Sequence, residues 1–286
     1  MKVMITGVNG QLGWELQRTA PQAYHVIPLS HQDLDITDMD AVMSGVEDAR
    51  PEVIINAAAY TAVDRAEQER ELAYAVNANG AANIAKATVS VGAKLIHIST
   101  DFVFDGKKSS PYLPEDTPNP LGVYGASKLE GERRVSELAK DHALIIRTAW
   151  VYSSHGSNFV KTILRLLKER DSLSVVSDQV GTPTWAKGLA QSVWRSIERR
   201  ILGVYHWTDA GVASWYDFAV AIQEEALAVG LLDKAIPVSP IRTEDYTTTA
   251  KRPAYSVLEK TRTWEVLEHI ALHWRVALRN MLQEFK

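Results

Sequence analysis

The stretch ITGVNGQLGWEL, residues 5–16, decides the fold. Its glycines Gly7, Gly10 and Gly13 form a G-x-x-G-x-x-G pattern between a strand-like apolar run, residues 2–6, and a helical segment. Glycines let a backbone turn tightly and approach a pyrophosphate, whose charge then lies at the N-terminus of the helix. Glycine triplets also occur in ordinary turns. A strand before this triplet and a helix after it favour a dinucleotide site.

The first half of the chain continues to alternate strand and helix. Apolar runs of strand length recur at residues 25–29, 52–59, 94–100 and 143–152. Helical patterns separate the last three of these runs, at residues 64–92 and 124–141. Nearly continuous apolar strands are typical of a parallel sheet covered on both faces. The sequence therefore predicts an α/β protein with a Rossmann-type, doubly wound parallel sheet.

The second half has a looser pattern of short strands and helices. It predicts a smaller C-terminal α/β lobe with a helix opened by Ser214 as N-cap and a closing helix from about Thr263. No Gly/Ser/Pro-rich linker separates the halves. We expect a dinucleotide-binding domain at 1–152 and a substrate-binding lobe at 153–286. The lobe is expected to be interleaved with the Rossmann core, to which some of its segments return.

Composition excludes several classes of function. The 286 residues are 46% apolar and 23% charged, with a formal net charge of −4. This balance argues against a surface that binds nucleic acid by neutralising phosphates. The absence of cysteine excludes disulfides, thiolate nucleophiles and cysteine-ligated metals. No apolar stretch approaches the roughly 20 residues that span a bilayer. We expect a cytoplasmic protein, a monomer or weak homodimer, with no nucleic-acid or membrane partner.

A possible acid–base group follows the fourth predicted strand. Ser99, Thr100 and Asp101 lie at its carboxyl end, where ligands of open α/β sheets bind. Tyr124 and Lys128 begin the next helical pattern and, four residues apart, share one face of it. Each pattern alone also occurs on ordinary helix surfaces and in ordinary turns. Their order after a glycine loop favours a catalytic set.

The chemistry of this set depends on the pKa of Tyr124. A tyrosine with a pKa of about 10 is a poor acid–base catalyst at neutral pH. A close ammonium group, Lys128, together with an oxidised nicotinamide, is expected to lower that pKa. The Thr100 hydroxyl is expected to hold the substrate oxygen where the proton moves.

The end of the second predicted strand bears on the choice of cofactor. An acidic residue about 20 positions after the glycine loop would bind the adenosine ribose. Asp33 lies at that distance, but the strand is closed by Ser30 and His31, neither of which is acidic. A 2′-phosphate is not repelled there, so both NADPH and NADH remain open. Asp35 fits two roles equally, covering the adenine edge with Ile36 or capping the next helix.

The chain resembles the extended short-chain dehydrogenase/reductase family and, within it, the dTDP-4-dehydrorhamnose reductases. ITGVNGQLG and PLGVYGASKLEGE are typical of the wider family. INAAAYTAVDRAE, HISTDFVFDG, VVSDQVGTPT and KRPAYSVL are more specific to these reductases. The resemblance implies reduction of the C4 carbonyl of dTDP-4-dehydro-L-rhamnose to dTDP-L-rhamnose, the last step of dTDP-rhamnose biosynthesis. NAD(P)H would supply the hydride and Tyr124 the proton.

The resemblance also implies a set of site residues, with Thr100, Tyr124 and Lys128 as the catalytic set. Residues implied to line the dinucleotide are Gly7, Asn9, Gly10, Gln11, Leu12, Gly13, Ser30, Asp35, Ile36, Ala57, Ala58, Ala59, Tyr124 and Lys128. Residues implied to contact the sugar nucleotide are Thr100, Asp101 and Trp150. Arg252 is a candidate for the diphosphate, because a guanidinium matches phosphate geometry. A solvated loop arginine is its alternative role.

Two positions depart from the family pattern. Phe102 stands where a tyrosine is usual, so a hydroxyl contact is missing. Some members share a metal between two subunits through a glutamate beside the glycine loop and carboxylates after the PT turn. Glu15 is present, but WAKGLAQ at residues 185–191 contains no acid. We therefore expect a metal-independent enzyme in which Glu15 interacts with the dipole of its own helix.

Two other classes share this scaffold. One is a nucleotide-sugar epimerase or dehydratase, which keeps its nicotinamide permanently bound; SDQVGTPT and KRPAYSVL favour the reductase over it. The other is a non-catalytic regulatory subunit, as in methionine adenosyltransferase. The intact Thr100, Tyr124 and Lys128 argue against that class.

Overall fold

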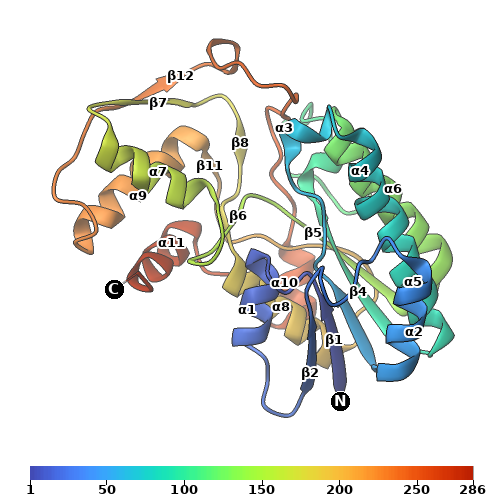
Figure 1. The fold of residues 1–286 in the computed structure, drawn as a ribbon. Coiled ribbons are helices and arrows are strands. Elements are labelled where there is room, and N and C mark those ends of the chain that lie inside the picture. Colours follow the sequence, from blue (N-terminus) through green and yellow to red (C-terminus); the bar gives the residue numbers. More distant parts are fainter. Residues whose placement is uncertain (286) are drawn as a thin grey trace.

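A six-stranded parallel β-sheet lies at the centre of the computed structural model, which describes residues 1–285 (Figure 1). In spatial order its strands are β10 (Gly203–His206), β5 (Ala143–Thr148), β4 (Lys94–Thr100), β3 (Val53–Asn56), β1 (Lys2–Thr6) and β2 (His25–Leu29). Because β1 lies between β2 and β3, the direction of winding reverses beside it, and ligands of open sheets bind at such a switch point. The predicted doubly wound parallel α/β sheet is confirmed.

Each face of the sheet packs against its own helices. Side chains alternate along a strand, so Val3 and Ile5 face one hydrophobic cluster and Met4 the other. The helices of the first cluster are α1 (Gln11–Arg18), α8 (Ala186–Arg199) and α10 (Thr261–Leu267). Those of the second are α2 (Met39–Ala49), α5 (Ala81–Ser90) and α6 (Val123–Ala139). Burial on both faces explains why the strands are almost continuously apolar.

The smaller lobe has a hydrophobic core of its own, on the left of Figure 1. Its helices are α7 (Phe159–Glu169), α9 (Trp215–Ala228) and α11 (Trp274–Gln283). Its paired strands are β6 (Val151–Tyr152) with β9 (Thr184–Trp185), β8 (Val180–Gly181) with β11 (Ala213–Ser214), and β7 (Leu173–Val176) with β12 (Val238–Ile241). The predicted N-cap is confirmed, because the Ser214 hydroxyl accepts a hydrogen bond from the Asp217 N–H at 3.0 Å.

Segments after Tyr152 return to the main sheet. β10 pairs with β5, and α8 shares a hydrophobic cluster with α1. The division of the chain at residue 152 remains a prediction.

The predicted helix at 64–92 is divided in the structure. It consists of α3 (Val63–Ala66), α4 (Arg70–Tyr74), a π-helical turn (Ala75–Gly80) and α5. Within the turn, the Asn77 amide accepts from the Tyr60 N–H at 2.9 Å and donates to its carbonyl at 3.0 Å. These two hydrogen bonds tie the π-helical turn to Tyr60, in the segment after β3. π-helical turns often lie near functional sites.

Two further segments end differently from the prediction. The strand predicted at 143–152 is interrupted at Trp150, whose φ of 47° is left-handed. The closing helix is two helices, α10 and α11. Short 3-10 helices lie at Asp101–Val103, Lys140–His142 and Thr243–Asp245.

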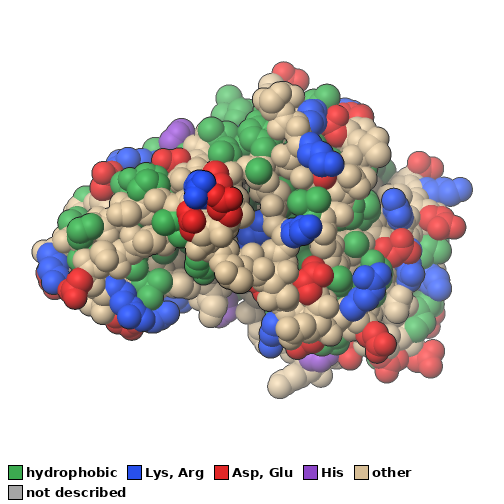
Figure 2. Space-filling view, turned by 90° about the horizontal axis from the view of Figure 1, so that it is seen from above, with side chains coloured by type: hydrophobic (Ala, Val, Ile, Leu, Met, Phe, Trp, Pro, Cys, Tyr) green, Lys and Arg blue, Asp and Glu red, His purple; other side chains and the backbone are tan. Residues whose placement is uncertain are grey.

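Acidic and basic side chains are interspersed on the face shown in Figure 2. Within residues 1–285, no helix combines the length and apolar character that crossing a membrane requires.

Candidate active site

The glycine loop lies at the switch point of the sheet. Gly7 follows β1 with a φ of 74°, and a Cβ there would lie 2.6 Å from the backbone nitrogen of Ala58, which follows β3. Only a glycine allows this close approach of the two loops. The N-cap of α1 is Gly10, so no side chain caps the first turn. The N–H groups of that turn are thus arranged as they are for a phosphate at a helix N-terminus.

The residues at the expected binding site of the adenosine form hydrogen bonds with their own neighbours. Asp33 accepts hydrogen bonds from the Ser30 N–H at 2.8 Å and the Ser30 hydroxyl at 2.6 Å, which lower the pKa of Asp33. Asp35 accepts from Thr37 in the same way, so its pKa is also lowered. The N-cap of α2 is Asp38. The alternative role of Asp35 as the cap of the next helix is therefore wrong.

Thr100 and Tyr124 come together where β4 ends and α6 begins. The Thr100 hydroxyl donates to Asp101 at 3.1 Å and accepts from the Phe102 N–H at 3.2 Å. The ring of Phe102 meets that of Tyr124 edge-on, with centroids 5.5 Å apart. At this position the phenylalanine gives Tyr124 an apolar neighbour in place of a second hydroxyl.

Desolvation dominates the pKa values in this group. It raises the pKa of the half-buried Tyr124 to about 12, with Thr100 lowering that pKa and Asp101 raising it further. The fully buried Asp101 has its pKa raised to about 6, again chiefly by burial. Burial lowers the pKa of Lys128 to about 8.

The expectation that Lys128 and an oxidised nicotinamide together lower the pKa of Tyr124 stays a prediction, because the pKa of about 12 reflects burial and includes no nicotinamide charge. The Lys128 ammonium donates to the Ile98 carbonyl at 2.6 Å, and Ile98 lies in β4 two residues before Thr100. Burial of the phenol outweighs the favourable contact with Thr100. Tyr124 is therefore held as a neutral phenol, which carries a proton that it can donate.

A buried ion pair that sequence reasoning missed supports this geometry. Glu132 of α6 and Arg147 of β5 meet at 2.7 Å, and both side chains are about 5% exposed. Ser99 donates to the same carboxylate. These contacts tie α6, which carries Tyr124 and Lys128, to β4 and β5. Its sequence signal was a single arginine inside the apolar run ALIIRT.

Arg252 lies at a cavity in the smaller lobe. Its guanidinium makes two bonds to Asp64, of 2.6 and 3.1 Å, and only 23% of its side chain is exposed. It is thus not a freely solvated loop arginine. The cavity has a volume of about 410 Å³, and its lining includes Gln179, Trp215, Tyr246 and Arg252.

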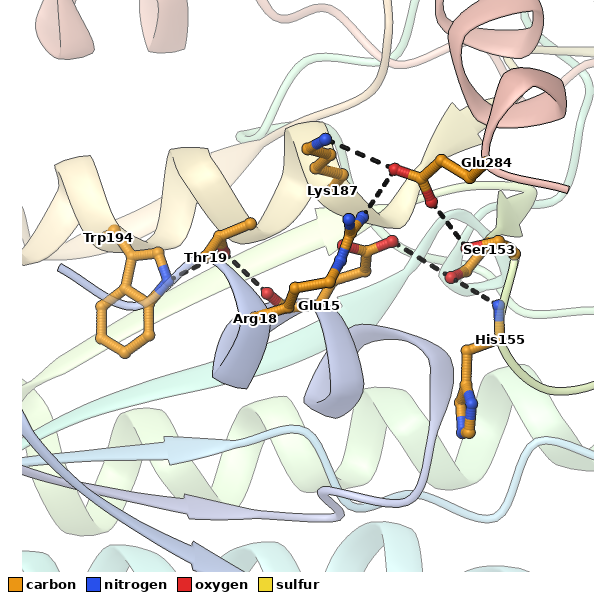
Figure 3. A network of polar contacts seen from close by, with 9 residues as sticks. Glu15, Arg18, Thr19, Ser153, His155, Lys187, Trp194 and Glu284 are labelled. Carbon is orange, nitrogen blue, oxygen red and sulfur yellow. Dashed lines mark hydrogen bonds and ion pairs between the residues drawn. The ribbon is translucent and has the colours of Figure 1, made fainter. Parts of the chain in front are cut away.

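Glu15 lies in a network that joins the two lobes (Figure 3). It is fully buried, with a raised pKa caused by burial, and accepts from Arg18 at 2.8 Å and from Ser153 at 3.2 Å. Glu284 bonds to Arg18 and to Ser154, at 2.8 and 2.7 Å. The expected interaction of Glu15 with the dipole of its own helix is wrong, because these side chains satisfy its carboxylate instead.

The segment after β6 packs on the glycine loop. The Asn158 amide donates to the Gln11 side chain at 2.9 Å, and the His155 ring contacts the Asn9 carbonyl at 3.1 Å. His155 also stacks on Trp14, with centroids 5.2 Å apart. Sequence reasoning missed these contacts, because partners more than a hundred residues apart leave no local pattern.

A doubly wound parallel sheet with a glycine loop at its switch point defines the class of Rossmann-type dinucleotide-binding proteins. Within that class, the chain belongs to the family described as RmlD substrate binding domain, whose model matches residues 1–286. A curated relative from Aggregatibacter actinomycetemcomitans, named dTDP-4-dehydrorhamnose reductase, is 43% identical over 288 residues, which cover 98% of each chain.

Solved structures of two such reductases are similar to this chain over nearly its whole length. The structure of a dTDP-4-dehydrorhamnose reductase from Clostridium acetobutylicum has a TM-score of 0.94 and 44% identity, covering 100% of this chain and 99% of the other. That of the reductase from Bacillus anthracis, in complex with NADP, has a TM-score of 0.93 and 41% identity, covering 99% of both chains.

Proposed function

We propose that this protein reduces the C4 carbonyl of dTDP-4-dehydro-L-rhamnose to dTDP-L-rhamnose. The family membership and the names of the relatives support this reaction. The NADP-bound relative supports NADPH as the hydride donor. The observation that carries the proposal is the family match over residues 1–286, together with the position of Thr100 at the carboxyl end of β4 and of Tyr124 at the start of α6.

The residues of the chain fit the dinucleotide. The uncapped first turn of α1 and the glycine loop suit a pyrophosphate. Ser30 directly follows β2 and carries no negative charge of its own, although Asp33 bonds to it. The dinucleotide, when bound, supplies a hydride to the carbonyl carbon. Lys128, with a pKa of about 8, is largely charged near neutral pH and suits the ribose hydroxyls beside Tyr124.

Proton transfer is the task of Tyr124. As the carbonyl carbon gains a hydride, negative charge develops on its oxygen, and the Tyr124 phenol donates its proton to that oxygen. An alkoxide is more basic than a phenolate even at a pKa of about 12, so the transfer is favourable. Thr100 holds the oxygen near the phenol. The products are a secondary alcohol and a tyrosinate, which is reprotonated from solvent.

The cavity in the smaller lobe suits the nucleotide part of the substrate. Its volume of about 410 Å³ lies within the usual size of small-molecule sites. Trp215 and Tyr246 offer aromatic surface, and Arg252 offers a guanidinium for the diphosphate. The diphosphate would compete with Asp64 for that guanidinium.

The test is oxidation of NADPH by purified protein with dTDP-4-dehydro-L-rhamnose, followed at about 340 nm. Tyr124→Phe is expected to reduce kcat by ~10²–10⁴-fold, the range for loss of a general acid. Its Kd for NADPH should stay close to that of the wild type. No absorbance loss with the wild-type protein would end the proposal, and full activity of Tyr124→Phe would remove Tyr124 from it.

A further inference from the structure

Trp150 connects β5 to β6 through an unusual backbone conformation. Its φ of 47° is left-handed, which is costly for a residue with a bulky side chain. Its carbonyl accepts from the Thr184 N–H at 3.1 Å, at the start of β9. Strain of this kind persists where the surroundings impose it, and it is concentrated at functional sites.

One side of the Trp150 indole lies against Gly181 in β8. A Cβ on Gly181 would lie 2.6 Å from Cε2 and 2.8 Å from both Cζ2 and Nε1 of Trp150. The backbone of Gly181 is outside the left-handed region, so contact with the indole alone requires glycine here. A larger residue would push the indole out of its place.

The other side of the indole lies against Trp215. The two rings are parallel to within 6°, with centroids 3.5 Å apart. Trp215 begins α9 directly after β11, and β11 pairs with β8 through Ala213 and Gly181. This strand pairing sets the separation between the two walls.

The motif segments that are specific to these reductases hold the walls in place. Val180 donates to the Ala254 carbonyl and accepts from the Ser256 N–H, both at 2.8 Å. The segments VVSDQVGTPT and KRPAYSVL are thereby joined along β8 (Figure 1). Neither segment contains Thr100, Tyr124 or Lys128. Their contacts with each other fix the backbone beside Gly181, which gives both segments a structural role.

We propose that Gly181 and Trp215 are positioning residues that form a slot for Trp150 and present the edge of its indole to the sugar of the substrate. Gly181 and Trp215 take up much of the ring surface, and the residue as a whole remains partly accessible. Thr148, which pairs with Thr100 in register, ends the strand two residues before Trp150. Trp150 thus follows the carboxyl end of β5, which lies directly beside that of β4. This inference rests on the proposed function, which supplies the sugar.

The test compares Gly181→Ala with Gly45→Ala. The new Cβ in the control variant, on helix α2, meets only Leu34 Cδ1 at an ordinary 3.6 Å. The measurements are kcat/KM for the sugar nucleotide, the Kd values of NADPH, dTDP and dTDP-L-rhamnose, and the exciton couplet that stacked indoles give in circular dichroism. The ratio of the dTDP and dTDP-L-rhamnose Kd values isolates the contribution of the sugar.

Gly181→Ala is expected to lower kcat/KM by ~10²-fold, as for a displaced positioning group. The couplet should change and the sugar contribution should be lost, while the Kd values of NADPH and dTDP stay within about twofold of wild type. Gly45→Ala should match the wild type throughout. If Gly181→Ala does not fold, Trp215→Phe, which keeps an aromatic wall, should retain more of the sugar contribution to binding than Trp215→Ala, because division by the dTDP Kd removes the part of Trp215 in the nucleotide cavity.

Three results would overturn the slot. These are unchanged kcat/KM in a folded Gly181→Ala, an equal loss of dTDP and NADPH binding, and an equal sugar contribution to binding in Trp215→Phe and Trp215→Ala. A wild-type protein that binds dTDP-L-rhamnose no better than dTDP would also overturn it. A wild-type protein without turnover contradicts only the proposed reaction, because the sugar contribution to binding still tests the slot.

Discussion

The guanidinium of Arg252 holds the carboxylate of Asp64 through two hydrogen bonds, of 2.6 and 3.1 Å. This contact joins the KRPAYSVL loop to α3, which follows β3. It lowers the pKa of Asp64, with Arg252 as the largest cause. The guanidinium is therefore held in one place at the cavity.

The contact predicts how Arg252 variants bind. Arg252→Ala should raise the Kd of dTDP by ~10-fold or more, because a hydrogen bond to a charged group contributes about 1.5–3 kcal/mol. Arg252→Lys should recover only part of the loss, because an ammonium lacks the two-pronged geometry. Calorimetric titration with dTDP is the measurement, with the exposed Arg262→Ala as control. Equal affinity in Arg252→Ala would place the diphosphate elsewhere.

The pKa of Lys128 predicts the alkaline side of the pH profile. Burial lowers that pKa to about 8, so the ammonium loses its charge as the pH rises through this value. We expect kcat/KM for NADPH to fall above about pH 8, and Lys128→Arg, which keeps its charge, to lose this decline. Steady-state kinetics across pH provide the measurement. A decline at the same pH in both proteins would assign it to another group.

The raised pKa of Asp101 predicts a change of stability with pH. The pKa is 3.8 ordinarily and about 6 in the folded protein, so the folded state binds this proton more tightly. The stabilisation from this group is complete below the unfolded value and is lost as the pH rises through about 6. The unfolding free energy of wild type minus that of Asp101→Asn should fall by ~3 kcal/mol over this window.

Urea titrations at about pH 4 and about pH 7 measure this difference. Other titrating groups are common to both proteins and cancel. A difference that does not vary with pH would contradict the raised pKa.

The buried Glu132–Arg147 pair predicts a contrast between single and double variants. Glu132→Leu should lower the free energy of unfolding by ~3–5 kcal/mol, because it leaves the Arg147 charge buried without a partner. Glu132→Leu combined with Arg147→Met should be more stable than the single variant, since no lone charge remains. Urea unfolding of both variants measures this difference in stability. A double variant less stable than the single one would show that the pair itself is strongly stabilising.

The hydrogen bond from Asn158, the N-cap of α7, to Gln11 at the start of α1 predicts an effect on NADPH binding. Asn158→Asp keeps the side-chain oxygen that caps α7 but loses the N–H that bonds to Gln11. The Kd of NADPH should rise by ~5–10-fold, the value of about one hydrogen bond plus an added negative charge near a phosphate. Fluorescence titration with NADPH is the measurement. Asn79→Asp, on the far side of the sheet near Arg134, is the matched control and should leave the Kd unchanged.

The strands and the glycine loop could be predicted because their signals are local. Gly7 follows a continuous apolar strand, and the run 94–100 is a strand over its whole length. The pKa of Tyr124 could not be predicted, because it depends on how much water packing removes from the phenol. The roles of Glu15 and Trp150 depend on Ser153 and Gly181, which come from other parts of the chain. Such side-chain partners have no signature in any one segment.

The return of β10 to the edge of the main sheet has a consequence for synthesis. β10 is the outer neighbour of β5, and α8, which covers one face of the sheet, precedes it in the chain. A nascent chain that ends at residue 152 leaves one edge of β5 unpaired and, of the helices α1, α8 and α10 on that face of the sheet, contains α1 alone. The nucleotide-binding half therefore cannot complete its fold on the ribosome before His206 has emerged. A fragment cut at residue 152 should accordingly aggregate.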